Sequence, residues 1–291
     1  MSIVPEAAIS DAAQAGFLDR EYNPRTQVPE FAVYFSRWKR DAQQVRATAR
    51  AHLDLRYGPA PAERLDFFPA GGTASPLLVF VHGGYWRALD KDDFSWIAPP
   101  YVAAGIGVAV VNYGLLPATA LMEIVAQVRR ACAWLHHNAR GLGVDAERIV
   151  CSGHSAGGHL AAMMIATDWP GVWAQFPRRL LSGAVTISGL FDLEPLTRAE
   201  FLRSDLRLDQ VLTRALSPVL LPWRTDVPVV RAVGEHESAE FHRQSMLIAE
   251  RWPQACAREL IDVPGCNHLS VCEAFADTDS ALFQATRELF C

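Results

Sequence analysis

Two short glycine-containing segments constrain the fold of this chain more than any other feature. His82-Gly83-Gly84-Tyr85-Trp86 follows the apolar run 77–81, and Gly153-His154-Ser155-Ala156-Gly157-Gly158-His159 follows the run 148–152. The second segment has the form G-x-S-x-G, which places a serine on a sharp turn between a strand and a helix. An H-G-G loop after an earlier strand is typical of backbone N–H groups that face a developing negative charge. Together they predict a sheet whose strands deliver a nucleophilic serine to one edge.

Short apolar runs alternate with amphipathic stretches along most of the chain. We expect strands over 64–69, 77–81, 106–111, 148–152, 183–188, 227–233 and 260–263, and helices over 121–138, 156–167, 239–251 and 278–290. Continuous apolar runs of this length are typical of strands covered on both faces. The alternation predicts an α/β class protein, with a mostly parallel twisted sheet and helices on both faces. Together with the two glycine-containing segments it indicates the α/β-hydrolase fold.

Three segments depart from this alternation. Residues 1–27 are polar with scattered apolar positions, and we expect an irregular arm there. From Phe31 to Leu53 apolar residues recur at spacings of three and four, which predicts a helix that ends at Tyr57-Gly58-Pro59. Residues 191–224 contain prolines and short apolar pairs that fit either a small cap over an active site or plain surface helices.

The length and composition favour one domain and exclude several classes of partner. With 291 residues, half of them hydrophobic, we expect a single domain over 1–291 whose arm and first helix occupy about 1–60. A net charge of −5 without a basic tract argues against nucleic acid. The longest apolar run, Gly105–Val111, is too short to span a bilayer.

The remaining bulk features concern location and partners. No basic residue precedes Arg20, which is not the pattern of a signal peptide, so we expect a cytoplasmic protein. The six cysteines form no C-x-x-C pair and their spacing fits no common zinc site. Because the chain shows no secretion signal, we expect these thiols to be reduced. We expect a small-molecule substrate and no membrane partner, and the sequence leaves a homodimer open.

Ser155 is the predicted nucleophile. A serine hydroxyl needs a base within hydrogen-bond reach, and the base needs a group that orients it. Gly153 and Gly157 flank Ser155, and glycines are needed there because a tight turn leaves no room for side chains beside the serine. An ordinary glycine-rich turn is the alternative, and the upstream H-G-G segment argues against it.

The H-G-G segment predicts the groups around the reacting carbonyl. We expect an oxyanion hole built from the N–H groups of Gly83, Gly84 and Ala156, where the start of a helix adds favourable partial charge. Tyr85 and Trp86 are expected to bind substrate as walls of its pocket, and plain core packing of these two side chains is an equal alternative.

The predicted base is His268, because the order in this fold is serine, acid, histidine. His268 lies in a loop directly after the last expected strand, whereas His242 falls inside an expected helix. His159, one turn into the helix after Ser155, is the main competitor, although a helical residue there is usually structural. The acid is expected after strand 227–233.

The loop at 234–238 contains no aspartate, so a glutamate must serve as the acid. Glu235 and Glu237 both qualify, and Asp192, after the preceding strand, is an outside candidate. A longer glutamate side chain can still reach an imidazole, and Ser-His-Glu triads are a known variant.

Several segments resemble the kynurenine formamidases (arylformamidases) of the α/β-hydrolase class. They are Glu21–Arg25, His82–Trp86, Gly153–His159, Ser188–Leu196, Glu237–Phe241 and Asn267-His268, which span nearly the whole chain. The family places its acid just before Ser-x-Glu-Phe, often as aspartate, and the resemblance therefore implies Glu237 rather than Glu235. It also implies that the protein needs no cofactor and no metal.

The resemblance implies a serine hydrolase that cleaves the formyl amide of N-formylkynurenine, a step of tryptophan catabolism, to the arylamine and formate. A small-molecule carboxylesterase or thioesterase with the same triad is the first alternative, since only the pocket would differ. A non-catalytic binder with a hydrolase fold is the second, and the intact serine, histidine and oxyanion loop argue against it.

Overall fold

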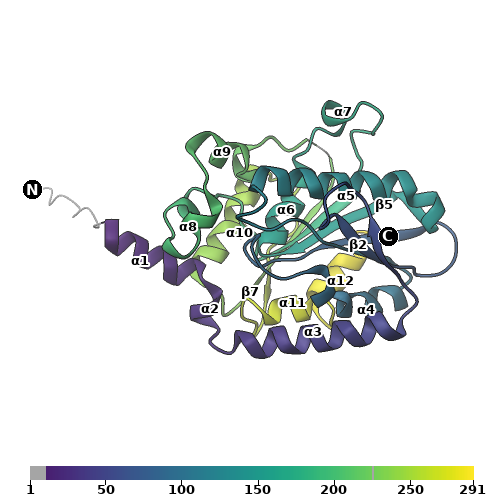
Figure 1. Ribbon diagram of the computed structural model, residues 1–291, viewed down its shortest axis with the longest axis horizontal. Helices are drawn as coiled ribbons and strands as arrows, with labels where there is room; N and C mark the ends of the chain where they lie inside the picture. The colour runs from purple at the N-terminus through teal and green to yellow at the C-terminus, as the bar shows by residue number, and fades with distance from the viewer. Residues whose placement is uncertain (1–10, 225) are drawn as a thin grey trace, which may run out of the picture.

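A central sheet of eight strands organises the computed structural model, which describes residues 11–224 and 226–291 (Figure 1). The strands are β1 (His52–Arg56), β2 (Arg64–Phe68), β3 (Ser75–Val81), β4 (Gly107–Val111), β5 (Val144–His154), β6 (Gly183–Ile187), β7 (Val229–Gly234) and β8 (Ile261–Val263). Their order is β1-β2-β4-β3-β5-β6-β7-β8. Only the pairs β1–β2 and β2–β4 are antiparallel. The predicted mostly parallel sheet is confirmed.

Helices cover both faces of this sheet. They are α1 (Asp11–Tyr22), α2 (Pro24–Gln27), α3 (Phe31–Thr48), α4 (Ala98–Ala103), α5 (Leu121–Leu142), α6 (Ala156–Ile165), α7 (Trp169–Val172), α8 (Glu200–Leu206), α9 (Gln210–Ala215), α10 (Ala239–Arg251), α11 (Ser270–Ala274) and α12 (Ala281–Glu288). In Figure 1, α5 and α6 lie above the sheet, and α3, α4, α11 and α12 lie below it.

The alternation of side chains along each strand produces two cores. In β3, Leu77, Val79 and Val81 pack with α5, α6 and α10, whereas Leu78 and Phe80 pack with α3, α4 and α12. Successive residues of a strand point to opposite faces, so a continuous apolar run serves both cores at once.

The N-terminal part differs from the sequence prediction. Residues 11–27 form α1 and α2 rather than an irregular arm, and residues 1–10 lie outside the described part. Tyr22 is fully buried, and its hydroxyl donates to Glu240 of α10 at 2.5 Å, so a distant contact orders the segment. The following helix ends at Thr48 rather than at 57–59, because the chain turns into β1 and pairs with β2.

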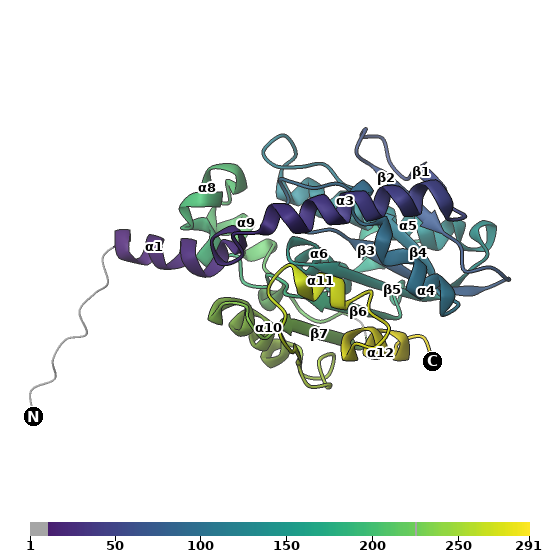
Figure 2. The ribbon, with the colours of Figure 1, turned by 90° about the horizontal axis from the view of Figure 1, so that it is seen from below.

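The carboxyl ends of the parallel strands bring four loops to one edge of the sheet. The H-G-G loop follows β3, Ser155 follows β5, the 234–238 loop follows β7 and His268 follows β8. Ligands of open α/β sheets bind at this edge. The 191–224 segment forms α8, α9 and two 3-10 turns, and α8 lies beside α1 in both ribbon views (Figures 1 and 2).

The cysteines and the lengths of the helices bear on two further expectations. All six cysteines are free thiols, and five of them are at least partly buried. Within residues 11–224 and 226–291, no helix combines the length and the apolar character needed to cross a bilayer.

Candidate active site

Ser155 occupies a sharp turn between β5 and α6. Its backbone has φ 56° and ψ −118°, a conformation that L residues seldom adopt, and its N–H donates to the Ile187 carbonyl at 2.8 Å. A Cβ on Gly153 would collide with the Gly157 carbonyl, and a Cβ on Gly157 would collide with that of Val81. The two glycines therefore let the backbone fold closely enough to present the serine.

His268 is paired with Glu237. The Nδ1 atom of His268 lies 2.6 Å from Glu237 Oε2, and both side chains are buried. The other carboxylate oxygen of Glu237 accepts from the Gly234 N–H at 2.7 Å and from the Ser188 hydroxyl at 2.5 Å. Because the carboxylate accepts at Nδ1, that nitrogen carries the proton and Nε2 is left as a base.

The competing acids do not contact His268. The exposed Glu235 accepts from the Gly265 N–H at 2.8 Å, and Asp192 accepts from the Glu194 N–H at 3.1 Å. The two glutamates of one short loop thus take opposite directions, and only Glu237 turns inward.

The competing histidine, His159, is a core residue. Its Nε2 donates to the Leu216 carbonyl at 2.8 Å, and its ring packs edge-on against Trp86 with centroids 5.1 Å apart. Complete burial lowers the pKa of His159 to about 4. His242 lies in α10, as expected.

The H-G-G loop packs directly against the serine turn. A Cβ on Gly83 would lie 2.8 Å from the His154 carbonyl oxygen and 3.1 Å from Ser155 Cβ, and Gly84 has φ +97°. The hydrogen bonds of the described residues give no acceptor to the N–H of Gly83 or Gly84. Ala156 begins α6, so its N–H has no acceptor within the helix. In the described part of the chain, these three N–H groups thus remain without a backbone acceptor, and Gly83 and Ala156 lie next to Ser155.

Two further histidines hold these loops. The sequence indicated that His82 organises its loop and is not the base, and it assigned no role to His154. His82 Nδ1 lies 2.8 Å from the Gly83 carbonyl, and its ring stacks on Tyr113 at 4.3 Å. His154 Nε2 donates to the His268 carbonyl at 2.7 Å. Burial lowers the pKa of His82, and it lowers the pKa of His154 much further. The sequence feature that could have indicated a role for His154 is its position next to Ser155.

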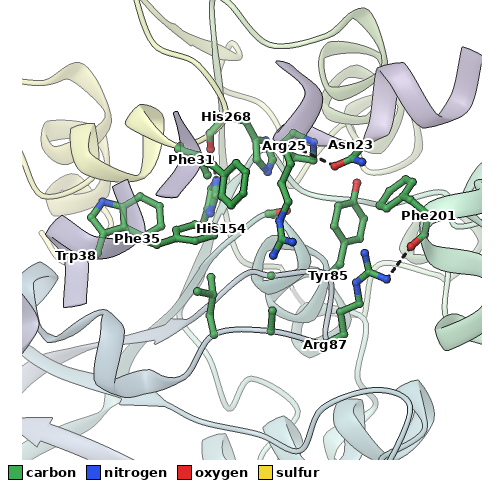
Figure 3. A pocket seen from close by; sticks show the side chains of 16 residues that line it. Asn23, Arg25, Phe31, Phe35, Trp38, Tyr85, Arg87, His154, Phe201 and His268 are labelled. Atoms are coloured by element: carbon green, nitrogen blue, oxygen red, sulfur yellow. Dashed lines mark hydrogen bonds between the residues drawn. The ribbon is translucent and has the colours of Figure 1, made fainter. Parts of the chain in front are cut away.

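Ser155 and His268 line one cavity of about 150 Å³ (Figure 3). Aromatic side chains form much of its wall, namely Phe31, Phe35 and Trp38 of α3, Phe201 of α8, and Tyr85. The sequence pattern identified the first three only as the apolar face of a helix, and Phe201 was not singled out.

Trp86 corrects one expectation. Tyr85 lines the cavity, but Trp86 is fully buried and is not among the lining residues. Tyr85 and Trp86 both have positive φ, at 51° and 55°, and this turn sends the tryptophan into the core against His159. Both side chains therefore belong to the core, and of the two only Tyr85 also lines the cavity.

A group of acidic residues lies away from the cavity. Oxygens of Asp54, Asp66 and Asp92 lie within 4.8 Å of one another. The buried Lys91 ammonium lies between 2.5 and 3.0 Å from each of the three carboxylates, and Arg46 also pairs with them. Two cations of the protein thus offset most of the negative charge of the three carboxylates and occupy their oxygens, so the cluster does not resemble a metal site.

This sheet, with a serine turn after β5, defines an α/β-hydrolase of the esterase and formamidase type. The BD-FAE family matches residues 65–170. Kynurenine formamidase of Salmo salar is 31% identical over 84% of this chain and 84% of its own, and that of Danio rerio is 29% identical over 91% and 92%. The chain belongs to the kynurenine formamidase family.

Solved structures agree with this fold. A Silicibacter protein, provisionally assigned as a thioesterase, is 33% identical with a TM-score of 0.82 and covers 92% of this chain and 97% of its own. Esterase B of Lactobacillus rhamnosis shares the fold at a TM-score of 0.69 and 18% identity, over 91% of this chain and 96% of its own.

Proposed function

We propose that this protein is a serine hydrolase that cleaves the formyl amide of N-formylkynurenine or a similar arylformamide to the arylamine and formate. The observation that carries the proposal is one small cavity on which Ser155, His268 and a set of aromatic rings converge. Aromatic walls suit an aryl leaving group, and the relationship to kynurenine formamidases supports the formyl amide.

In the first half of the proposed reaction, Ser155 Oγ attacks the formyl carbon. His268 Nε2 takes the hydroxyl proton, and Glu237 stabilises the imidazolium through Nδ1. The carbonyl oxygen becomes an oxyanion, which the N–H groups of Gly83, Gly84 and Ala156 stabilise. The C–N bond then breaks, and His268 returns the proton to the leaving aniline nitrogen.

In the second half, water hydrolyses the formyl-serine. His268 Nε2 takes a proton from water as its oxygen attacks the formyl carbon, and a second oxyanion forms against the same donors. The bond to Ser155 Oγ breaks, the serine recovers a proton from His268, and formate leaves. These residues supply the nucleophile, base and charge stabilisation, so the proposal includes no cofactor and no metal.

The proposal assigns substrate binding to a roof over Ser155, defined here as α2, α3 and α8. Phe31, Phe35 and Trp38 come from α3, and Phe201 brings α8, within the 191–224 segment, to the cavity. Tyr85 contacts this roof, because its ring lies edge-on to Phe201 with centroids 5.1 Å apart. We therefore propose that 191–224 acts as a cap, on one domain with the rest of the chain.

A carboxylesterase or thioesterase acting on small acyl groups is the second candidate. The 33% identity to the Silicibacter protein, which carries a thioesterase assignment, favours it specifically. The two candidates share all the chemical steps and differ in the leaving group. In either case we propose a small-molecule substrate and a cytoplasmic location.

The experiment that tests the proposal is the kcat/KM of the purified protein for N-formylkynurenine beside p-nitrophenyl acetate, with Ser155→Ala as the blank. We expect a strong preference for the formamide. Ester cleavage with little formamide turnover would be consistent with the proposed triad and would indicate that the protein is an esterase. No turnover of either, with no labelling of Ser155 by a fluorophosphonate, would favour a non-catalytic binder.

A further inference from the structure

The charge around the cavity differs from that of the whole chain. The protein has a net charge of −5, yet the described residues that line the cavity include two arginines, Arg25 and Arg87, and no aspartate or glutamate. Glu237 lies behind His268, where it is hydrogen-bonded on both oxygens. The wall that a substrate meets is therefore cationic.

One of the two arginines already has an acidic partner. The Arg87 Nη1 lies 2.8 Å from Asp205 Oδ2 and donates to the Phe201 carbonyl at 2.7 Å. Its guanidinium also lies 5.7 Å from the centre of the Phe201 ring. Arg87 therefore fastens α8 to the loop after β3, and its charge is balanced within the protein.

Arg25 has no such partner among the described residues. Its guanidinium lies 5.1 Å from the centre of the Phe31 ring, and no side-chain hydrogen bond or carboxylate within ion-pair distance accompanies it. Figure 3 shows this guanidinium pointing into the cavity, toward the space between His154 and Tyr85. An exposed cation that points into the cavity shared by Ser155 and His268 is free to bind an anion.

The backbone around Arg25 is held firmly. The Asn23 side chain accepts from the Arg25 N–H at 3.2 Å, and Pro24 is buried at the start of α2. The Tyr85 hydroxyl donates to the Tyr22 carbonyl, and the Ser238 hydroxyl donates to that of Glu21 at 2.6 Å. Bonds from both neighbouring loops thus fix the origin of the side chain over the site.

We propose that Arg25 binds a carboxylate on the leaving-group side of the substrate and makes the enzyme selective for anionic acyl compounds. A guanidinium presents paired N–H donors that match the two oxygens of a carboxylate. The inference rests on the proposed function for the reacting end, and N-formylkynurenine carries a carboxylate in its amino-acid part. Arg25 acts in binding and takes no part in proton transfer.

The test uses two matched substrate pairs. The first pair is N-formylkynurenine and its side-chain carboxamide, and the second is 3-acetoxybenzoate and 3-acetoxybenzamide. Each pair keeps the bond to be cleaved and exchanges a carboxylate for a neutral group. The kcat and KM are measured for the wild type, Arg25→Gln, Arg25→Lys and the control Arg20→Gln, whose residue is exposed on α1 outside this cavity.

For the wild type we expect kcat/KM to favour the carboxylate by about 10- to 100-fold, as a charge-assisted hydrogen bond provides. Arg25→Gln should bring this ratio close to 1, mainly by raising KM for the carboxylate, and Arg25→Lys should retain part of it. Arg20→Gln should keep the wild-type ratio. An unchanged ratio in Arg25→Gln, with both members reduced equally or neither reduced, would overturn the proposal.

The two pairs separate this inference from the proposed function. A charge preference in the ester pair, lost in Arg25→Gln, supports the role of Arg25 even if formamides are not cleaved. Turnover of both formamides without any charge preference would leave the proposed function standing and refute the role of Arg25.

Discussion

The floor of the cavity and its roof are built in different ways. The floor, defined as Ser155, His268, Glu237 and the H-G-G loop, follows the ends of parallel strands, where close backbone contacts leave little freedom. The roof consists of helices whose side chains reach the cavity from the sequence segments 24–48 and 200–206. The comparison teaches that groups proposed for chemistry are fixed by the backbone, whereas groups proposed for selectivity are replaceable side chains.

Removal of the proposed nucleophile from the floor should have the largest effect. Ser155→Ala is expected to lower kcat/KM by at least about 10⁴-fold, because no other described residue supplies the attacking oxygen at this turn. The melting temperature should stay near that of the wild type, with Ser182→Ala, a substitution away from the cavity, as a control. Full activity in Ser155→Ala would show that Ser155 is not the nucleophile.

The next largest effect concerns the acid. Glu237→Gln should lower kcat by about 10³-fold, less than the loss of Ser155, because a neutral amide does not stabilise the imidazolium. Glu235→Gln is the matched control two residues away, and its exposed side chain should be nearly neutral to activity. If Asp192→Asn proved worse than Glu237→Gln in a folded protein, the acid assignment would be wrong.

The third prediction tests the fit of the H-G-G loop on the serine turn. Gly83→Ala places a Cβ 2.8 Å from the His154 carbonyl, which pushes the loop away from the turn and should lower kcat about 10²-fold. Gly141→Ala, where the new Cβ meets open space in α5, serves as the control. An unchanged kcat in Gly83→Ala would argue against an oxyanion role for this loop.

A smaller effect is expected on the pH dependence of the free energy of unfolding, through a hydrogen bond between α6 and the 191–224 segment. His159 of α6 binds Leu216 within 191–224, and its folded pKa of about 4 lies below the ordinary value of about 6.5. The unfolded chain therefore takes up the proton first, and stability present above pH 6.5 is lost as the pH falls toward 4. Between pH 7.5 and 5 this amounts to about 2 kcal/mol.

Urea unfolding at these two pH values checks the prediction. His159→Gln has no imidazole to protonate, so its unfolding free energy should fall less than that of the wild type over the same range. Equal losses in the two proteins would show that His159 does not titrate as a buried group.

The smallest expected effect belongs to the roof. Phe201→Ala should raise KM for an aryl substrate about fivefold and change kcat less, because it removes apolar contact area and no group that transfers a proton. Phe17→Ala provides the control, since this phenylalanine is 43% exposed on α1 and lies outside the cavity. A large fall in kcat with constant KM would contradict this prediction and indicate that Phe201 supports the chemical step, like the residues of the floor.

The sequence predicted the floor better than the roof for a physical reason. Ser155 and its glycines form a local turn whose constraints are readable within five residues. The choice between Glu235 and Glu237 needed either a family resemblance or the fold, because both lie in one loop and only contacts distinguish them. Trp86 illustrates the limit, since two successive positive φ values decide which of two adjacent aromatic rings reaches the cavity.

The first helices were missed because their order depends on distant partners. The sequence of residues 11–27 carries no strong helical pattern. The contacts of Tyr22 with Glu240 and Gln244 hold this segment in place. Phe31, Phe35 and Trp38 were recognised as a helical face, but that face serves both the core below the sheet and the cavity. Periodicity reports that a face is covered and does not report whether protein or substrate covers it.

The bonds that hold the start of α2 have a consequence for biosynthesis. Tyr22 is hydrogen-bonded to residues of α10, so the segment that carries Arg25 cannot take its final place until the ribosome has released residue 244. Domains generally fold as their chain emerges, and these early helices must wait for a late one. Strands β1 to β7 leave the ribosome before residue 244, so most of the sheet can form before the segment that carries Arg25 is fixed over the cavity.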